Sequence, residues 1–188
     1  IERVLNLQQT RDYQIVFIDD QKSTGEFYQT LLEDAQCEVY FMDSVQAMFN
    51  GLDNIHPDLF IFDMNMPQVD GLEATKMIRQ QKQFDFTPII ILTADEQLET
   101  KLAALRGGAD DVIAKSTPPA MVIKLLLTRL KRSLSVREFV SKDSLTGVLN
   151  HGQIMVAAMT HFRLSRRQKT SGSIAMLDID RFKAVNDT

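Results

Sequence analysis

The chain has 188 residues, 44% of them hydrophobic, and a formal net charge of −4 at pH 7. This composition supports a packed core, and the acidic balance argues against nucleic acid as the main partner, because nucleic-acid-binding faces usually carry a basic excess. Cys37 is the single cysteine and favours a reducing, cytoplasmic location, and no apolar run reaches the roughly 20 residues of a membrane helix, so we expect no membrane partner.

In chain order, the first segment is weakly patterned, and residues 1–9 could be the end of a helix from an upstream domain. Five short apolar runs rich in Ile, Val and Phe follow, each ending in polar residues. Such continuous runs are typical of strands buried on both faces. The predicted strands are 15–18, 39–41, 59–62, 89–92 and 112–114.

Helix-length stretches separate these runs. The first helix is predicted to begin at a capping box of Ser23 and Glu26. Its apolar face is predicted from residues at helical spacing, namely Phe27, Leu31, Leu32 and Ala35. The next helix has apolar residues at i, i+3, i+4 and i+7, namely Val45, Met48, Phe49 and Leu52.

The last helix of this series is predicted to start with Thr117 as N-cap and Pro118 in the first turn, and to run to about residue 142. The helix before the fifth strand is predicted to end at Gly107 and Gly108. Two apolar faces share the long helix. One is a short coiled-coil seam for a second copy, formed by Ile123, Leu127, Leu130 and Leu134, and the other packs on the sheet through Met121, Val122, Leu125 and Leu126. We expect the helix to dock first and then project toward a partner copy.

The alternation of strands and helices predicts an α/β fold with a parallel sheet and helices on both faces. In such sheets, sites form at the carboxyl ends of the strands. Five polar side chains stand at the ends of the predicted strands, namely Asp19, Asp20, Asp63, Thr93 and Lys115. They are expected to meet at one edge of the sheet.

Clustered carboxylates repel one another and raise each other's pKa unless a cation intervenes. Oxygen-only ligands favour a hard ion such as Mg2+, and a carboxylate can attack phosphorus to give an acyl phosphate. The alternative for each residue alone is structural, since Asp or Thr can cap a helix and Lys115 can be an exposed charge. Their convergence on one edge favours a site for phosphoryl transfer.

Four segments resemble the motifs of two-component receiver domains. They are residues 14–20, residues 61–67 with Asp70 and Gly71, residues 91–94, and residues 108–115. The resemblance covers about two-thirds of the chain and implies the doubly wound, flavodoxin-like five-stranded parallel sheet of order 2-1-3-4-5. It also implies a phosphohistidine donor on a sensor histidine kinase or phosphotransfer protein.

The resemblance implies a role for each strand-end residue. Asp63 would be the phosphoacceptor. Mg2+ would be held by Asp19, Asp20, Asp63 and the backbone carbonyl of Asn65, and the phosphoryl oxygens would be contacted by Thr93 and Lys115. Two positions depart from the family pattern, because Val112 replaces a usual aromatic residue and Ser116 replaces a usual proline.

Residues 143–150 and 174–187 resemble the opening, and the first strand with its following turn, of GGDEF domains. That family joins two GTP molecules into cyclic di-GMP. The resemblance implies a Mg2+ site at Asp178 and the carbonyl of Ile179. It also implies a GTP site at Arg181, Phe182, Lys183 and Asn186.

The predicted organisation is an upstream helix or linker at 1–12, a receiver domain at 13–134, a helical connector at 135–142 and an incomplete α+β GGDEF domain at 143–188. Because the printed sequence starts with Ile1 and stops before a GG(D/E)EF loop, we interpret it as part of a longer protein and expect it to be inactive as a cyclase.

The favoured function is a receiver that controls a diguanylate cyclase output in a homodimer. Three alternatives remain. One is a receiver-type dimerisation module with a degenerate, non-cyclase GGDEF output. Another is a small-molecule enzyme that uses Asp63 as a nucleophile with turnover. The third is a dimer module that works without phosphorylation.

Overall fold

The computed structural model describes residues 13–52, 55–141, 146–175 and 177. The predictions for residues 1–12 lie outside the described residues. The chain divides into two compact units, Ile1–Arg137 and Glu138–Thr188, and each is described by itself. Among the described residues, no helix combines the length and apolarity needed to cross a bilayer.

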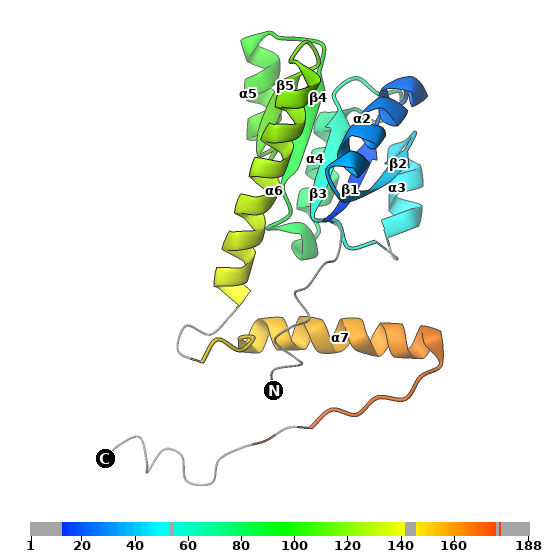
Figure 1. The fold of residues 1–188 in the computed structure, drawn as a ribbon, viewed down its shortest axis with the longest axis vertical. Helices are drawn as coiled ribbons and strands as arrows, with labels where there is room; N and C mark the ends of the chain where they lie inside the picture. Colours follow the sequence, from blue (N-terminus) through cyan, green and yellow to red (C-terminus); the bar gives the residue numbers. More distant parts are fainter. Residues whose placement is uncertain (1–12, 53–54, 142–145, 176, 178–188) are drawn as a thin grey trace, which may run out of the picture. The chain divides into compact units, whose positions relative to one another are not determined.

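The first unit is built on five parallel strands, β1 (Tyr13–Ile18), β2 (Cys37–Met42), β3 (Leu59–Asp63), β4 (Ile89–Thr93) and β5 (Asp111–Ala114). Their order in the sheet is β2-β1-β3-β4-β5, with β1, β3 and β4 inside (Figure 1). The predicted doubly wound fold and strand order are therefore confirmed.

Helices alternate with the strands. They are α2 (Lys22–Asp34), α3 (Val45–Gly51), α4 (Gly71–Arg79), the short 3-10 turn η3 (Lys82–Phe84), α5 (Leu98–Arg106) and α6 (Pro119–Ser141). Alternate residues of each inner strand feed two separate cores. One core receives buried side chains from α2 and α6, and the other from α3, α4 and α5. Burial on both faces explains why the strands are continuous apolar runs.

The start of α2 differs from the prediction. Its N-cap is Gln21 and no side chain caps it, so the expected capping box of Ser23 and Glu26 is wrong. Ser23 already lies within the first turn. Phe27 was assigned to the buried face but is 48% exposed, whereas Tyr28 is buried beside Leu32.

The apolar face predicted for α3 is confirmed, since Val45 and Met48 are buried in one of the two cores. The N-cap of the helix is Ser44, whose hydroxyl accepts the N–H of Ala47 at 3.3 Å. The predicted end of α5 is also confirmed, with Gly107 as its C-cap.

The long helix α6 begins one residue later than expected. Because a residue that precedes proline is disfavoured in the helical region, Pro118 before Pro119 stays outside the helix. The carbonyl of Pro118 instead accepts the N–H groups of Met121 and Val122 at 2.8 and 3.1 Å.

The assignment of the faces of α6 is partly wrong. Val122, Leu126 and Leu130 are fully buried against the sheet, so Leu130 belongs to the core and not to an exposed seam. Met121 was expected on the sheet but is 55% exposed. A spacing of four residues is compatible with either face of the helix. Leu130 packs against the sheet because Leu130 follows Val122 and Leu126 at that spacing.

The second unit contains the helix α7 (His151–Gln168). A strand was expected to begin at residue 174, but residues 174, 175 and 177 do not form one. Ile174 is exposed, and Leu177 is 94% exposed. A strand gains stability by pairing with neighbours, and no strand that could serve as one is present among the described residues of this unit.

Candidate functional site

Three carboxylates meet at the carboxyl edge of the sheet. Asp19 and Asp20 follow β1, and Asp63 is the last residue of the neighbouring strand β3. One carboxylate oxygen from each residue lies within 4.8 Å of the others. Asp19 and Asp63 are buried, whereas Asp20 is exposed. The structure therefore brings together the acidic residues singled out from the sequence.

Lys115 provides a positive charge inside this cluster. Its ammonium nitrogen lies 2.8 Å from Oδ1 of Asp63 and 2.9 Å from Oδ2 of Asp19. The backbone of Lys115 is fixed as well, because its N–H donates to the carbonyl of Thr93 at 2.7 Å. Lys115, the first residue after β5, is thus hydrogen-bonded to the end of β4, and its side chain contacts the carboxylates that follow β1 and end β3.

Burial and charge act in opposite directions on this pair. Burial raises the pKa of Asp63, the hydrogen bond and charge of Lys115 lower it, and the nearby Asp19 and Asp20 raise it again, so that the pKa lies above its ordinary value. For Lys115, burial lowers the pKa, but the hydrogen bonds and charges of Asp63 and Asp19 outweigh this effect and leave the pKa raised. The ammonium group of Lys115 therefore does not fully offset the burial of Asp63 and the charges of Asp19 and Asp20.

The donor set fits a hard divalent ion. Asp19, Asp20 and Asp63 offer carboxylate oxygens, which Mg2+ prefers. The raised pKa of Asp63 shows that a further positive charge would stabilise the ionised cluster. Asn65, whose carbonyl was predicted as a ligand, lies exposed in the loop two residues after Asp63.

Thr93 is buried at the end of β4, next to β3, but its hydroxyl is engaged elsewhere. It donates to the carbonyl of Asp95 at 3.2 Å and accepts the N–H of Asp95 at 3.0 Å. The Asp95 carboxylate accepts a hydrogen bond from the Thr100 hydroxyl at 2.7 Å. This bond, with one from the Gln97 N–H, lowers the pKa of Asp95. Thr93 therefore organises the loop between β4 and α5.

Gly71 positions the loop that follows Asp63, a role that the sequence prediction did not assign. Its N–H donates to the carbonyl of Met64 at 3.0 Å. A Cβ at this position would lie 2.3 Å from the carbonyl oxygen of Asp63. The adjacent Asp70 caps α4 in a capping box with Glu73. A glycine directly after a capping Asp is the signal that could have revealed this close approach.

A hollow of about 350 Å³ lies beside Lys115, between the first turns of α2 and α6, and Ser23, Phe27 and Tyr28 contribute to its lining. Tyr28 was also missed by the sequence analysis. Its ring packs edge-on against Phe17 at 5.8 Å, and burial raises the pKa of its hydroxyl.

The two positions that depart from the family pattern have ordinary surroundings. Val112 packs, partly buried, against the core formed with α3, α4 and α5. The hydroxyl of Ser116 donates to the Glu96 carboxylate at 2.5 Å. Val112 lies three residues before Lys115 and Ser116 lies directly after it. With these residues in place, Lys115 still contacts Asp63 and Asp19.

The family model of the response regulator receiver domain matches residues 15–127, which is more than half of the chain. The chain belongs to the response regulator receiver family. The model of the GGDEF diguanylate cyclase domain matches residues 140–188. A receiver domain is therefore followed by a GGDEF match, as the sequence motifs predicted.

Relatives and solved structures agree with this assignment. The chain is 36% identical over 124 residues to the response regulator ArlR of Staphylococcus aureus, covering 64% of this chain and 52% of ArlR. It is 29% identical over 145 residues to the transcriptional regulatory protein PhoP of Bacillus subtilis, covering 76% of this chain and 59% of PhoP. The chain thus spans little more than half the length of these two relatives. The chemotaxis response regulator CheY4 of Vibrio cholerae matches with a TM-score of 0.60 and 28% identity, over 63% of this chain and 99% of CheY4.

The residues predicted for the second site fall outside the described residues. They are Asp178, Ile179, Arg181, Phe182, Lys183 and Asn186.

Proposed function

We propose that the receiver domain accepts a phosphoryl group on Asp63 in a Mg2+-dependent reaction. The observation that carries this proposal is the buried Asp63 carboxylate, held 2.8 Å from the Lys115 ammonium and within 4.8 Å of oxygens from Asp19 and Asp20. This set combines a nucleophile, a fixed cation and oxygen donors for a metal at one sheet edge.

The donor in this proposal is a phosphohistidine of a sensor histidine kinase or a phosphotransfer protein. An oxygen of the ionised Asp63 carboxylate attacks phosphorus, and the bond between phosphorus and the donor imidazole nitrogen breaks. The nitrogen keeps the electron pair and takes up a proton. The product is an acyl phosphate on Asp63 and a neutral histidine on the donor.

The surrounding residues act by holding charge and position. Asp19 and Asp20, with Asp63 and the carbonyl of Asn65, would bind Mg2+, which supplies charge neutralisation at the phosphoryl oxygens. Lys115 already lies against Asp63 and would contact a phosphoryl oxygen from the same place.

The Thr93 hydroxyl would exchange its hydrogen bonds to the Asp95 backbone for one to the phosphoryl group. This exchange releases the loop before α5, which gives phosphorylation a route to the face of α5 and α6. Because Val112 is smaller than the aromatic residue usual at this position, we expect the loop to carry most of the change.

The output proposed for the whole protein is the synthesis of cyclic di-GMP from GTP. The GGDEF match at residues 140–188 supports this output, with Asp178 and the carbonyl of Ile179 as metal ligands. Arg181, Phe182, Lys183 and Asn186 would bind GTP. A homodimer is proposed because two GTP molecules must meet, and α5 and α6 expose apolar side chains suited to a second copy, including Leu98, Leu105 and Met121.

The test is incubation of the chain with a small acyl phosphate and Mg2+, followed by mass spectrometry. We expect the mass of one phosphoryl group to be added in wild type, and none in Asp63→Asn or in the presence of EDTA. The matched control is Asp34→Asn, which removes an exposed carboxylate outside the cluster. Rapid turnover of the donor without a stable adduct would favour a small-molecule enzyme. No adduct in wild type, with unchanged oligomeric state in beryllofluoride and Mg2+, would favour a phosphorylation-independent dimer module.

A further inference from the structure

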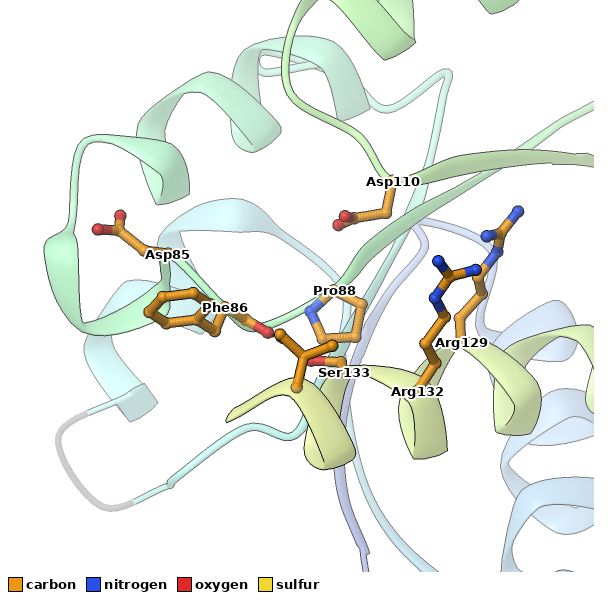
Figure 2. Close-up of a pocket in the computed structure, with 8 residues that line it drawn as sticks. Asp85, Phe86, Pro88, Asp110, Arg129, Arg132 and Ser133 are labelled. Carbon is orange, nitrogen blue, oxygen red and sulfur yellow. Dashed lines mark hydrogen bonds between the residues drawn. The ribbon is translucent and has the colours of Figure 1, made fainter. Parts of the chain in front are cut away.

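The way in which α6 is held on the sheet changes along its length. Up to Leu134 the helix is held by apolar side chains, because Val122, Leu126 and Leu130 are fully buried and Leu134 packs, partly buried, against the same core. Beyond Leu134, Val136 is 46% exposed, and a hollow of about 370 Å³ lies between the helix and the segments that lead into β4 and β5. In Figure 2, Phe86 and Pro88 line one side of this hollow, and Arg132 and Ser133 line the other.

Three polar side chains in the second half of α6 contact residues at or just before the starts of β3, β4 and β5. Arg129 donates through Nε and Nη2 to Oδ2 of Asp111, at 3.0 and 2.7 Å. The hydroxyl of Ser133 donates to the carbonyl of Phe86. Arg129 and Ser133 are four residues apart, and the third member, Arg137, is four residues further on. They therefore form one stripe on the helix.

Arg137 pairs with a carboxylate that is already built into the sheet. Its Nη2 lies 3.2 Å from Oδ1 of Asp58, whose side chain is fully buried. The other oxygen of Asp58 accepts the N–H of Gln14 at 3.1 Å, and the N–H of Asp58 donates to the carbonyl of Gln14 at 2.7 Å. Asp58 cannot follow the helix if the helix moves, because it is fixed between the starts of β1 and β3.

Breaking this ion pair is unfavourable for Asp58, the partner on the sheet. A buried carboxylate that loses a cationic partner keeps its desolvation penalty. The Arg137 side chain is 37% exposed, so the arginine can regain water when it leaves. The pair is therefore a contact that holds the helix firmly, yet can open without any apolar side chain leaving the core.

We propose that the Arg137–Asp58 pair is the final anchor of the connector helix, and that it decides whether α6 is held on the receiver beyond Leu134. With the pair intact, the helix is held as far as Arg137. With the pair broken, the residues after Leu134 lose this contact, while the apolar contacts up to Leu134 and the Ser133 hydrogen bond remain. Asp58 precedes β3 and Asp63 ends it, so the anchor lies at the opposite end of this strand from the proposed phosphoacceptor.

The test is hydrogen exchange of the full 188-residue chain, measured by mass spectrometry on Arg137→Gln. We expect amides of residues 134–141 to exchange about tenfold faster or more, as for the local loss of one charged hydrogen bond, and strand amides to keep their wild-type rates. The matched control is Arg132→Gln on the same helix, since Arg132 makes no ion pair with any residue that the structure describes. This control should exchange at the wild-type rate throughout.

A second arm uses Asp58→Asn and the double variant. Because both single changes break the same contact, the double variant should exchange no faster at 134–141 than the faster single variant. Three results would overturn the proposal. They are unchanged exchange at 134–141 in Arg137→Gln, equal acceleration in Arg132→Gln, and faster exchange in all strands, which would make the pair an element of global stability. None of these readouts requires phosphorylation, so failure of the proposed function leaves this test intact.

Discussion

The Lys115 ammonium lies 2.8 Å from Oδ1 of Asp63, and the same nitrogen lies 2.9 Å from Oδ2 of Asp19. One cation therefore serves two buried carboxylates that come from adjacent strands. With Asp20 nearby, the cluster holds more negative than positive charge. Together with the burial of Asp63, this imbalance fixes the sign of the first two predictions.

The first prediction concerns pH and the phosphoacceptor. The folded-state pKa of Asp63 is raised above 3.8, mainly by burial, so its neutral form stabilises the fold. That contribution is complete below pH 3.8 and is lost as the pH rises through the folded-state pKa. In the absence of Mg2+, Asp63→Asn should therefore be more stable than wild type near neutral pH, because the asparagine carries no charge that burial would penalise.

Urea denaturation across this pH range provides the measurement. The difference between Asp63→Asn and wild type should shrink as the pH falls toward 3.8. Asp34→Asn, which changes an exposed carboxylate, should show no comparable difference. A wild type more stable than Asp63→Asn near neutral pH would contradict the prediction.

The second prediction concerns cation binding. Lys115→Met removes a positive charge 2.8 Å from a predicted metal ligand, so Mg2+ should bind about tenfold more tightly, as expected for removing a close like charge from a partly buried site. Isothermal titration calorimetry would measure the affinity. Lys124→Met on the exposed side of α6 is the control and should leave the affinity unchanged. Weaker binding in Lys115→Met would show that the lysine organises the cluster more than it competes with the ion.

The third prediction concerns backbone packing next to the site. In Gly71→Ala the new Cβ would lie 2.3 Å from the carbonyl oxygen of Asp63, and backbone atoms cannot move aside easily. We expect a loss of roughly 3 kcal/mol in the free energy of unfolding, together with slower phosphorylation. In Gly51→Ala the nearest atom is a flexible Met42 methyl at 3.1 Å, so this control should be close to neutral. Urea denaturation of both variants would separate the two cases.

The fourth prediction concerns Arg79, at the end of α4, which the sequence analysis did not single out. Its guanidinium donates to the carbonyls of Gly108, Phe84 and Thr87 and to the Asp110 carboxylate, at 2.7 to 3.0 Å. Lysine lacks this fork of donors, so Arg79→Lys should cost about 2 kcal/mol and Arg79→Met about 3 kcal/mol. The exposed Arg106→Met is the control. Thermal denaturation in which Arg79→Lys matches wild type would disprove the role of the fork.

Much of the fold was predictable because inner strands of a doubly wound sheet are apolar on both faces. The segments 15–18, 59–62 and 89–92 stood out as continuous runs for this reason. The polar residues after these runs then located the edge where the carboxylates and Lys115 meet. The strand order followed from the family resemblance and is confirmed by the structure.

Features that depend on geometry between distant segments were not predictable. Helical spacing alone could not tell whether Leu130 faced the sheet or a second copy, and it placed Phe27 inside although Tyr28 is the buried ring. The hydrogen bonds of Thr93 to Asp95 likewise require the path of a loop. The contact of Arg137 with Asp58 joins residues 79 positions apart, which no local pattern encodes.

The central strand β3 has a buried carboxylate at each end, Asp58 just before it and Asp63 as its last residue. Two cations that pair with them, Arg137 and Lys115, are both synthesised after β4. Until these residues leave the ribosome, a nascent chain lacks both ion pairs, and burying the two acids is less favourable. The central strand should therefore gain its full stability only after most of α6 has left the exit tunnel, late in translation of the domain.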